Sequence, residues 1–211
     1  MMSSNEACTR IDVLRHGQCE GGHIFRGSND VALLPEGHAA MHASCETVLS
    51  SATRPWDVVL TSPLSRCLSF ARPLAERHLL SLEVVDDLRE MSFGAWEGRE
   101  ILAVMQEDAE RMRAWGDDPV RNSPPEGEAL HEFSARVQEV YEHVLSAYRG
   151  KHVLLVTHGG VLRVLFALML GLPLNKIQSI DAPYACISRF AVFHTETGDI
   201  PKLLTHNAQP S

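Results

Sequence analysis

Short apolar runs alternate with longer amphipathic segments along this chain of 211 residues. Several of the runs are rich in β-branched residues and end in a polar sequence that contains histidine, serine or arginine. Runs of this kind are typical of parallel strands that are buried on both faces. The predicted strands are residues 10–14, 57–60, 152–156 and 186–193, with weaker candidates near 82–85 and 202–205.

Segments with helical periodicity lie between these runs, and Gly171-Leu172-Pro173 is a stop signal for the last of them. Strands that alternate with helices indicate a three-layer α/β/α sandwich around a mostly parallel central sheet. The length suits one domain over residues 1–211, with a core at about 10–195 and short flexible termini. The predicted helices are residues 36–51, 65–78, 101–115, 129–148 and 160–170.

The composition, with 45% hydrophobic and 22% charged residues, is that of a soluble globular protein. No run of about eighteen apolar residues is present, which argues against a transmembrane helix, and the N-terminal sequence lacks the pattern of a secretory signal. A net charge of −8 argues against a nucleic-acid partner and means that an anionic ligand needs a local positive pocket. Five cysteines without a CxxC pair argue against a disulfide framework or a zinc site and suit a cytoplasmic location.

Short sequences with candidate catalytic and anion-binding residues follow the three strongest predicted strands. They are RHG at residues 15–17, TSPLSR at 61–66 and THGG at 157–160. Sheets of this kind bind ligands at the carboxyl ends of their strands. We therefore expect these three sequences to lie close together at one edge of the sheet, although they are far apart along the chain.

The RHG sequence places His16 at a rigid strand end, where a nucleophile can be held still. The guanidinium of Arg15 suits the oxygens of a phosphate group, and Gly17 allows the backbone to approach a ligand closely. Taken alone, this sequence is equally compatible with a surface histidine in an ordinary turn.

Two predicted helix starts carry further candidates. Ser65 is expected to cap its helix, which puts Arg66 in the first turn, against the helix dipole, and so suggests a nearby anion. The helix that follows His158 offers unpaired N–H groups at Gly159 and Gly160, a ready anion site. The alternatives are a solvated arginine and an incidental histidine in a capping turn.

Glu90 lies in a glycine-punctuated loop with aromatic residues, LREMSFGAWEG at residues 88–98. A carboxyl group near apolar rings can have a raised pKa and act as a proton donor. The alternative is a solvated loop carboxylate, because one glutamate among many is a weak signal.

Together, in this order, the four segments resemble the histidine phosphatase superfamily, also called the phosphoglycerate mutase-like family, from about residue 10 to residue 170. The resemblance implies that His16 is the nucleophile, which forms a phosphohistidine, and that Glu90 protonates the leaving alcohol and then activates water. It also implies that Arg15, Arg66 and His158 form the phosphate pocket. The implied substrate is a small phosphate monoester, and no metal or other cofactor is implied.

The segment GGHIFRGSND at residues 21–30, together with SPLSRC and THGGVLR, resembles the α-ribazole-5'-phosphate phosphatase branch, which acts in assembly of the cobalamin nucleotide loop. This resemblance implies that Arg26 and Gly27 line the mouth of the pocket and contact the substrate. Gly17 and Gly159 are the candidate backbone contacts to the phosphate. Phosphoglycerate mutases carry a longer insertion between the acid and the second histidine, whereas here 68 positions separate residues 90 and 158. In the loop SPPEGEA, Ala129 replaces the serine that is usual in the family.

Several alternatives stay open at this point. A broad-specificity sugar- or nucleotide-phosphate phosphatase is the main one, followed by a phosphoglycerate mutase and a non-catalytic binder of phosphorylated ligands. His38 and His42 have i, i+4 spacing and are either a solvated helix face or two ligands of a metal without an evident third. The apolar final helix is either core or a contact between two subunits of a homodimer.

Overall fold

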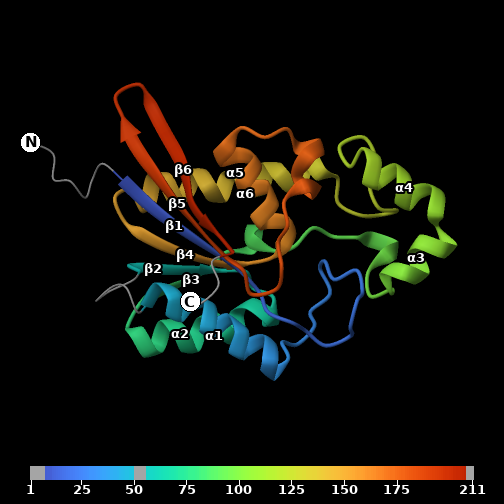
Figure 1. Ribbon diagram of the computed structural model, residues 1–211, viewed down its shortest axis with the longest axis horizontal. Helices are drawn as coiled ribbons and strands as arrows, with labels where there is room; N and C mark the ends of the chain where they lie inside the picture. Colours follow the sequence, from blue (N-terminus) through green and yellow to red (C-terminus); the bar gives the residue numbers. More distant parts are fainter. Residues whose placement is uncertain (1–7, 50–55, 208–211) are drawn as a thin grey trace, which may run out of the picture.

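The computed structural model describes residues 8–49 and 56–207, which are built around one six-stranded sheet (Figure 1). The strand order across the sheet is β3-β2-β4-β1-β5-β6. Neighbours among the first four strands are parallel, whereas β5 and β6 are antiparallel to their neighbours. The predicted α/β architecture with a mostly parallel sheet is therefore confirmed. The strands are β1 (Cys8–Arg15), β2 (Val58–Thr61), β3 (Ser81–Val84), β4 (His152–Thr157), β5 (Ile187–Thr195) and β6 (Gly198–His206).

The register of the three central strands brings their carboxyl ends together. Arg15 at the end of β1 pairs with Thr157 at the end of β4, and Thr61 at the end of β2 pairs with Val156. The main-chain N–H of His16 continues this ladder by donating to the carbonyl of Thr157 at 2.8 Å. The sequences RHG, TSPLSR and THGG therefore start from the same edge of the sheet, as expected.

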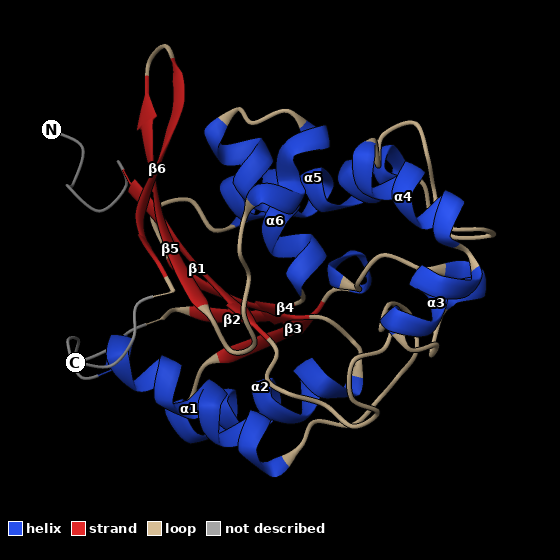
Figure 2. Cartoon of the chain, turned by 45° about the vertical axis from the view of Figure 1, so that its right-hand side comes forward, coloured by secondary structure: helices blue, strands red, loops and turns tan. Residues whose placement is uncertain are grey.

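Helices cover both faces of the sheet (Figure 2). On one face lie α1 (Pro35–Leu49) and α2 (Ser65–His78), and on the other lie α5 (Leu130–Ala147) and α6 (Gly159–Leu170). These helices agree with the predicted ones to within about two residues at each end that the structure describes. Residues 50 and 51, the predicted end of the first helix, lie outside the described residues.

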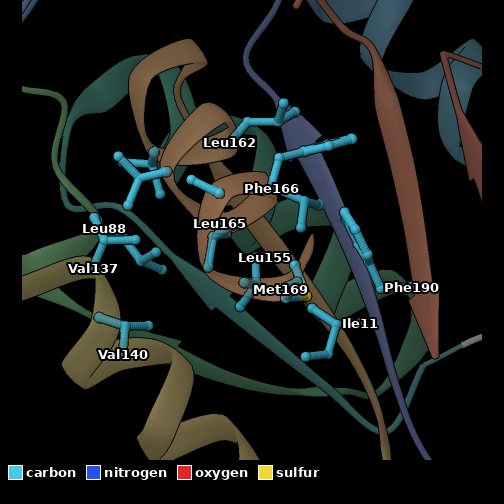
Figure 3. Packing of buried hydrophobic residues seen from close by; sticks show 14 of the residues in the cluster. Ile11, Leu88, Val137, Val140, Leu155, Leu162, Leu165, Phe166, Met169 and Phe190 are labelled. Carbon is cyan, nitrogen blue, oxygen red and sulfur yellow. The ribbon is translucent and has the colours of Figure 1, made fainter. Parts of the chain in front are cut away.

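The strands bury side chains on both faces, which explains why their sequences lack polar–apolar alternation. On β1, Ile11 faces α5 and α6, where it packs with Leu155 and Phe166 (Figure 3). Leu14 on the same strand faces the opposite way and belongs to the core that includes Phe70 of α2. Two apolar layers thus hold the carboxyl ends of β1 and β4 rigidly in place.

The predicted helix 101–115 is wrong in one respect, because it is broken at Asp108. The structure contains α3 (Ile101–Glu107) and α4 (Ala109–Asp117), and Asp108 between them has φ −129° and ψ 41°, outside the helical region. The carboxylate of Asp108 accepts a hydrogen bond from the indole of the fully buried Trp96 at 3.1 Å. The helix break is therefore accompanied by a tertiary contact between Asp108 and Trp96. Helical periodicity in the sequence gives no information on such a contact.

The helices α3 and α4 cover a third, smaller apolar cluster beside the main core. Its buried members are Phe25, Trp96 and Val104, and partly buried aromatic and aliphatic side chains pack against them. Two short 3-10 helices flank the loop of Glu90, and the second of them contributes Trp96 to this cluster. The 3-10 helices are η1 (Asp86–Leu88), η2 (Gly94–Trp96) and, before β5, η3 (Leu174–Ser179).

Within residues 8–49 and 56–207, every helix is too short or too polar to cross a membrane. The sheet extends past the expected core limit of about residue 195, because β6 forms its edge strand. Of the termini that were expected to be short and flexible, residues 1–7 and 208–211 lie outside the described part of the chain.

Candidate active site

His16 follows β1 directly, and only 3% of its surface is exposed. Its ring Nδ1 lies 2.8 Å from the carbonyl oxygen of Gly17. A carbonyl only accepts, so Nδ1 carries the proton and Nε2 keeps its lone pair. Burial, followed by the charges of Arg15 and Arg66, lowers the pKa of His16 well below its usual value of 6.5. The ring is therefore neutral near pH 7, as a histidine nucleophile has to be.

Gly17 and Cys19 shape the surroundings of this ring. The Sγ atom of Cys19 lies 3.5 Å from Nδ1 of His16 and 3.4 Å from the Gly17 carbonyl, on the same side as the Nδ1 proton. A Cβ added at Gly17 would meet the backbone oxygen of Gly37 at 2.1 Å. The missing side chain of Gly17 thus allows α1 to pack against the strand end, and its carbonyl fixes the tautomer of His16.

Arg15 lies between the α6 N-terminus and the turn before β5. One Nη of Arg15 donates to the carbonyl of Ala182, and its Cζ lies 4.3 Å from the ring centroid of Tyr184. A Cβ added at Gly159 would meet Nε of Arg15 at 3.2 Å, so glycine at this position gives the guanidinium its room. The predicted site residues Arg15 and Gly159 therefore lie side by side at the cavity.

Arg66 lies in the first turn of α2, as predicted, and is completely buried. Its Nη1 and Nη2 donate to the carbonyls of Asn29 and Gly27, each at 2.7 Å, and its Nε donates to Nδ1 of His158 at 3.2 Å. Backbone carbonyls, rather than a carboxylate, satisfy this cation. It consequently keeps its positive charge for the site beside it.

The expected cap of α2 by Ser65 is wrong. The capping position is Leu64, without a side-chain cap, and the N–H of Ser65 donates instead to the Asp30 carboxylate at 2.7 Å. The negative charge of a carboxylate interacts more favourably with the positive end of the helix dipole than a neutral hydroxyl does. Asp30 thereby also ties residues 27–30 to the helix that carries Arg66.

Glu97 organises the same loop from the other side. Its two carboxylate oxygens accept from the main-chain N–H groups of Gly27, Ser28 and Asn29 at 3.2, 2.8 and 3.3 Å. They also accept from the N–H of Phe93 at 2.8 Å. With its N–H groups turned towards Glu97, the loop offers its carbonyls to Arg66. Residues 27–30, Glu97 and the buried Arg66 are therefore one connected structure.

His158 is the N-cap residue of α6 and is fully buried. Because its Nδ1 accepts from Arg66, its Nε2 carries the proton and donates to Oγ of Ser62 at 2.8 Å. Burial, followed by the charges of Arg66 and His16, lowers the pKa of His158 well below 6.5. Its ring lies edge-on to that of His16, with centroids 5.2 Å apart. The two histidines of the RHG and THGG sequences are thus neighbours.

Glu90 reaches the site from the loop after η1, with 9% of its surface exposed. Its Oε2 accepts from the N–H of Gly160 at 2.9 Å, and its Oε1 accepts from the N–H of Met91 at 3.0 Å. Gly160 is the second residue of α6, so the carboxylate occupies the positive end of that helix. A Cβ added at Gly160 would lie 2.2 Å from Oε1 of Glu90, so only glycine leaves room for this contact.

An ion pair behind this loop holds Glu90 in place. Arg136 of α5 binds both oxygens of Glu128, at 2.7 and 2.9 Å, and donates to the carbonyls of Asp87, Arg89 and Glu90.

The loop SPPEGEA leads into α5, as expected. Ala129 is the N-cap of that helix and has no side-chain oxygen to cap it, although its N–H donates to Glu132 at 3.4 Å.

A cavity of about 240 Å³ opens on this edge of the sheet. Its charged and titratable lining residues are Arg15, His16, Arg26, Glu90 and Arg163. Among the described lining residues, three arginines accompany a single carboxylate, so the cavity favours an anion. The remainder of the wall is largely apolar and aromatic: Ile24, Phe25, Met91, Phe93, Ile101, Trp115, Pro119, Leu130, Phe133 and Ile177.

The structure brings all the predicted site residues to this region, but in two layers. His16, Arg15, Arg26, Glu90 and Gly159 line the cavity. Behind them, Gly27 and Arg66 hold each other, Arg66 holds His158, and Gly17 fixes the His16 ring. The roles that the family resemblance implies for these residues stay predictions.

Sequence reasoning missed three polar residues of the site. They are Tyr184, Glu97 and Arg163. Tyr184 contacts both Arg15 and Arg26. The pKa of Arg163 is lowered by burial and then by the charge of Arg15. Arg163 lies in THGGVLR, four residues beyond Gly159, so its position on the α6 face towards the site is readable from helical spacing. Nothing local marks Tyr184.

Metal-binding groups are absent from the described part of the chain, where no three His, Cys, Asp or Glu side chains are grouped to hold an ion. His38 and His42, the metal candidates of the sequence, pack on each other and on Phe70, with ring centroids 4.8–5.3 Å apart.

The fold and the site together define a phosphatase. The chain belongs to the histidine phosphatase superfamily, branch 1, whose family model matches residues 11–204. It is 30% identical over 181 residues to the adenosylcobalamin/alpha-ribazole phosphatase of Escherichia coli K12, which corresponds to 85% of this chain and 88% of that protein.

Solved structures agree with this assignment. The alpha-ribazole phosphatase from Shigella flexneri has a TM-score of 0.78 at 29% identity, covering 96% of this chain and 98% of that one. The mycobacterial glucosyl-3-phosphoglycerate phosphatase Rv2419c with VO3 has a TM-score of 0.80 at 28% identity, covering 95% and 99%. The relatives thus share the phosphatase class and differ in the substrates that their names give.

Proposed function

We propose that this protein is a metal-independent phosphomonoesterase that transfers a phosphoryl group to Nε2 of His16 and then to water. The supporting observation is the state of His16, which is buried and neutral, with its Nδ1 proton donated to the Gly17 carbonyl. His16 lines a cavity that three arginines, Arg15, Arg26 and Arg163, also line. Positive groups that are fixed in advance stabilise the charge on the equatorial oxygens of a transferring phosphoryl group.

In the first step, Nε2 of His16 attacks phosphorus, the N–P bond forms, and the bond to the ester oxygen breaks. Glu90 in its acid form gives its proton to the departing oxygen. In the second step, the Glu90 carboxylate takes a proton from water, the water oxygen bonds to phosphorus, and the N–P bond breaks. Inorganic phosphate leaves, and both residues return to their starting protonation states.

For the substrate, we propose α-ribazole 5'-phosphate, in assembly of the cobalamin nucleotide loop. The names of the E. coli and S. flexneri relatives support this proposal, and so does the wall of the cavity. Phe25, Phe93 and Trp115 contribute aromatic surface to this wall, which suits the planar, apolar base of this compound better than a small polar alcohol. We further propose a cytoplasmic, single-domain enzyme without a nucleic-acid or membrane partner.

A broad-specificity sugar- or nucleotide-phosphate phosphatase is the second candidate. The relative named for glucosyl-3-phosphoglycerate favours it, because a similar fold there accompanies a different leaving group.

Phosphate release in excess chelator tests the mechanism. Wild type and His16→Ala are compared on α-ribazole 5'-phosphate, 3-phosphoglycerate, a sugar phosphate and p-nitrophenyl phosphate. His131→Ala, at an exposed position of α5, is the matched histidine control. We expect wild type and the control to turn over without metal and His16→Ala to be inactive, with α-ribazole 5'-phosphate giving the highest kcat/KM.

A rapid quench at alkaline pH adds a direct readout, because a phosphohistidine is stable there and appears as a phosphate adduct on the peptide that contains His16. Activity that is lost with chelator, or retained in His16→Ala, contradicts the mechanism. Equal kcat/KM for all four substrates instead favours the broad-specificity phosphatase and leaves the mechanism intact.

A further inference from the structure

Tyr184 lies in the turn between η3 and β5, and the backbone of Arg15 and His16 anchors this turn. The N–H of Ala185 donates to the carbonyl of His16 at 3.1 Å, and the N–H of Arg15 donates to the carbonyl of Cys186 at 3.0 Å. Ala185 adopts a left-handed conformation, with φ 57°, which turns the chain sharply after Tyr184. The turn is thereby fixed against the strand end that carries the proposed nucleophile.

The side chain of Tyr184 contacts three predicted site residues at once. Its ring centroid lies 4.3 Å from Cζ of Arg15 and 5.6 Å from the ring centroid of His16. Its hydroxyl oxygen accepts from Nη1 of Arg26 at 3.1 Å. The ring lines the cavity, and 37% of the residue is exposed. Tyr184 therefore links the arginine of the RHG sequence to the arginine of the loop at residues 21–30.

These two arginines share an unusual property. Among the described residues, the Nε atoms of Arg15 and Arg26 are the buried side-chain nitrogen or oxygen atoms without a hydrogen-bond partner. An unpaired buried donor is unfavourable, and more so on a cation. Arg66, by contrast, has Nε, Nη1 and Nη2 all paired. Arg15 and Arg26 thus gain the most from an oxyanion that enters the cavity.

We propose that Tyr184 is a positioning residue of the phosphate site, which sets the plane of Arg15 by stacking and holds Arg26 by its hydroxyl so that both guanidinium groups serve one phosphate. The proposal rests on the phosphomonoesterase function proposed above. Stacking on an aromatic ring fixes the orientation of the guanidinium plane and leaves its positive charge unchanged. The hydroxyl accepts one Nη proton and leaves the charge of Arg26 intact.

Two substitutions separate the two contacts. Tyr184→Phe removes the hydrogen bond to Arg26, and Tyr184→Leu removes the aromatic face as well. Tyr148→Phe is the matched control, because it removes a hydroxyl that donates to Glu83 at 2.6 Å, away from the cavity. Orthovanadate, which mimics phosphate, is the binding probe, and p-nitrophenyl phosphate is the substrate.

We expect Tyr184→Phe to raise the KM and the inhibition constant of orthovanadate about tenfold, the usual size of one charged hydrogen bond, with kcat changed less than about twofold. Tyr184→Leu is expected to raise both by about thirtyfold or more, because the cation–π contact is lost too. The control is expected to match wild type.

The pKa of His16 gives a readout that a merely structural role would not move. Besides Tyr184, the charged or titratable groups that face this ring are Arg15, Arg26, Arg66, Cys19 and His158. Burial is the largest cause of the lowered pKa of His16, followed by the charges of Arg15 and Arg66 and, last, of Arg26. Tyr184→Phe keeps the ring beside His16, so a rise in the pKa of His16 in this variant, followed by NMR titration of the free protein, reports the release of Arg26 and not a loss of burial.

Wild-type vanadate inhibition and an unshifted His16 titration in both variants overturn the role of Tyr184. If His16→Ala remains inactive in the same experiments, the phosphatase mechanism stands without it. Absence of turnover and of vanadate inhibition in wild type contradicts the mechanism itself. Tyr184→Phe, which removes one oxygen from a partly exposed residue, decides the question even where Tyr184→Leu does not fold.

Discussion

The contact between Glu90 and the N-terminus of α6 is tested by Gly160→Ala. A Cβ at this position would lie 2.2 Å from Oε1 and 3.1 Å from Cδ of Glu90, and 3.2 Å from Cζ of Phe133. Ordinary van der Waals contacts begin at 3.4 Å, so the carboxylate has to retreat by about 1 Å. Its hydrogen bond from the N–H of Gly160, at 2.9 Å, is strained or lost in the process.

The magnitude follows from the role of Glu90 as the proposed proton donor. A misplacement of about 1 Å costs on the order of a hundredfold in rate, or about 2.7 kcal/mol of transition-state stabilisation. Stability is expected to behave differently. Gly160 lies inside α6 without a positive φ, and alanine favours a helix over glycine by up to about 1 kcal/mol. Activity should therefore fall without a matching fall in the free energy of unfolding.

The assay compares kcat/KM and urea unfolding of Gly160→Ala with those of two other glycine-to-alanine variants. Gly116→Ala on α4 has no heavy atom within 4 Å of its new Cβ and is expected to match wild type in activity. Gly159→Ala, whose Cβ would lie 3.2 Å from Nε of Arg15, is expected to fall between them. Wild-type kcat/KM in Gly160→Ala would refute the placement of Glu90 as the proton donor.

Two further predictions concern the surroundings of Arg66 and the histidines. Glu97→Gln replaces one accepting oxygen by an N–H donor that faces backbone N–H groups, so we expect kcat/KM to fall at least about tenfold. The control Glu110→Gln, at an exposed position, should have no effect. Equal kcat/KM values in the two variants would contradict the role of Glu97. His16 and His158 have a pKa below 6.5 when folded, so the unfolded chain binds more protons below about pH 6.5, and the free energy of unfolding should decrease as the pH falls through that range. Urea unfolding from pH 7.5 to 5.0 checks this against His16→Asn, whose slope should be smaller, and parallel slopes would argue against a buried neutral His16.

The sequence predicted the part of the site that strand topology determines. The carboxyl ends of parallel strands meet at one edge, so polar residues directly after β1, β2 and β4 had to become neighbours. His16, Arg66 and His158 were found in this way. Glu90 came with the family resemblance, since one loop carboxylate among many has no distinguishing local pattern.

The residues that sequence reasoning missed depend on contacts between distant segments. Tyr184 bonds to Arg26 across 158 positions, and Glu97 reaches Gly27 across 70. The same holds for the wrong details of the fold. Asp30 caps α2 from 35 residues away, in place of Ser65. Hydrophobic periodicity reports which face of an element is buried, and it carries no information on which side chain from elsewhere meets it.

The small apolar cluster of Phe25, Trp96 and Val104 has a consequence for how such enzymes diversify. Its three buried residues belong to neither of the two cores that hold the sheet, and Phe93 and Trp115 of the cavity wall pack against them. Replacements there can reshape the recess for the departing alcohol while the strand ends that hold His16 stay undisturbed. A change of substrate then needs no change in the residues that carry out the reaction, and solved structures of similar fold bear the names of different substrates.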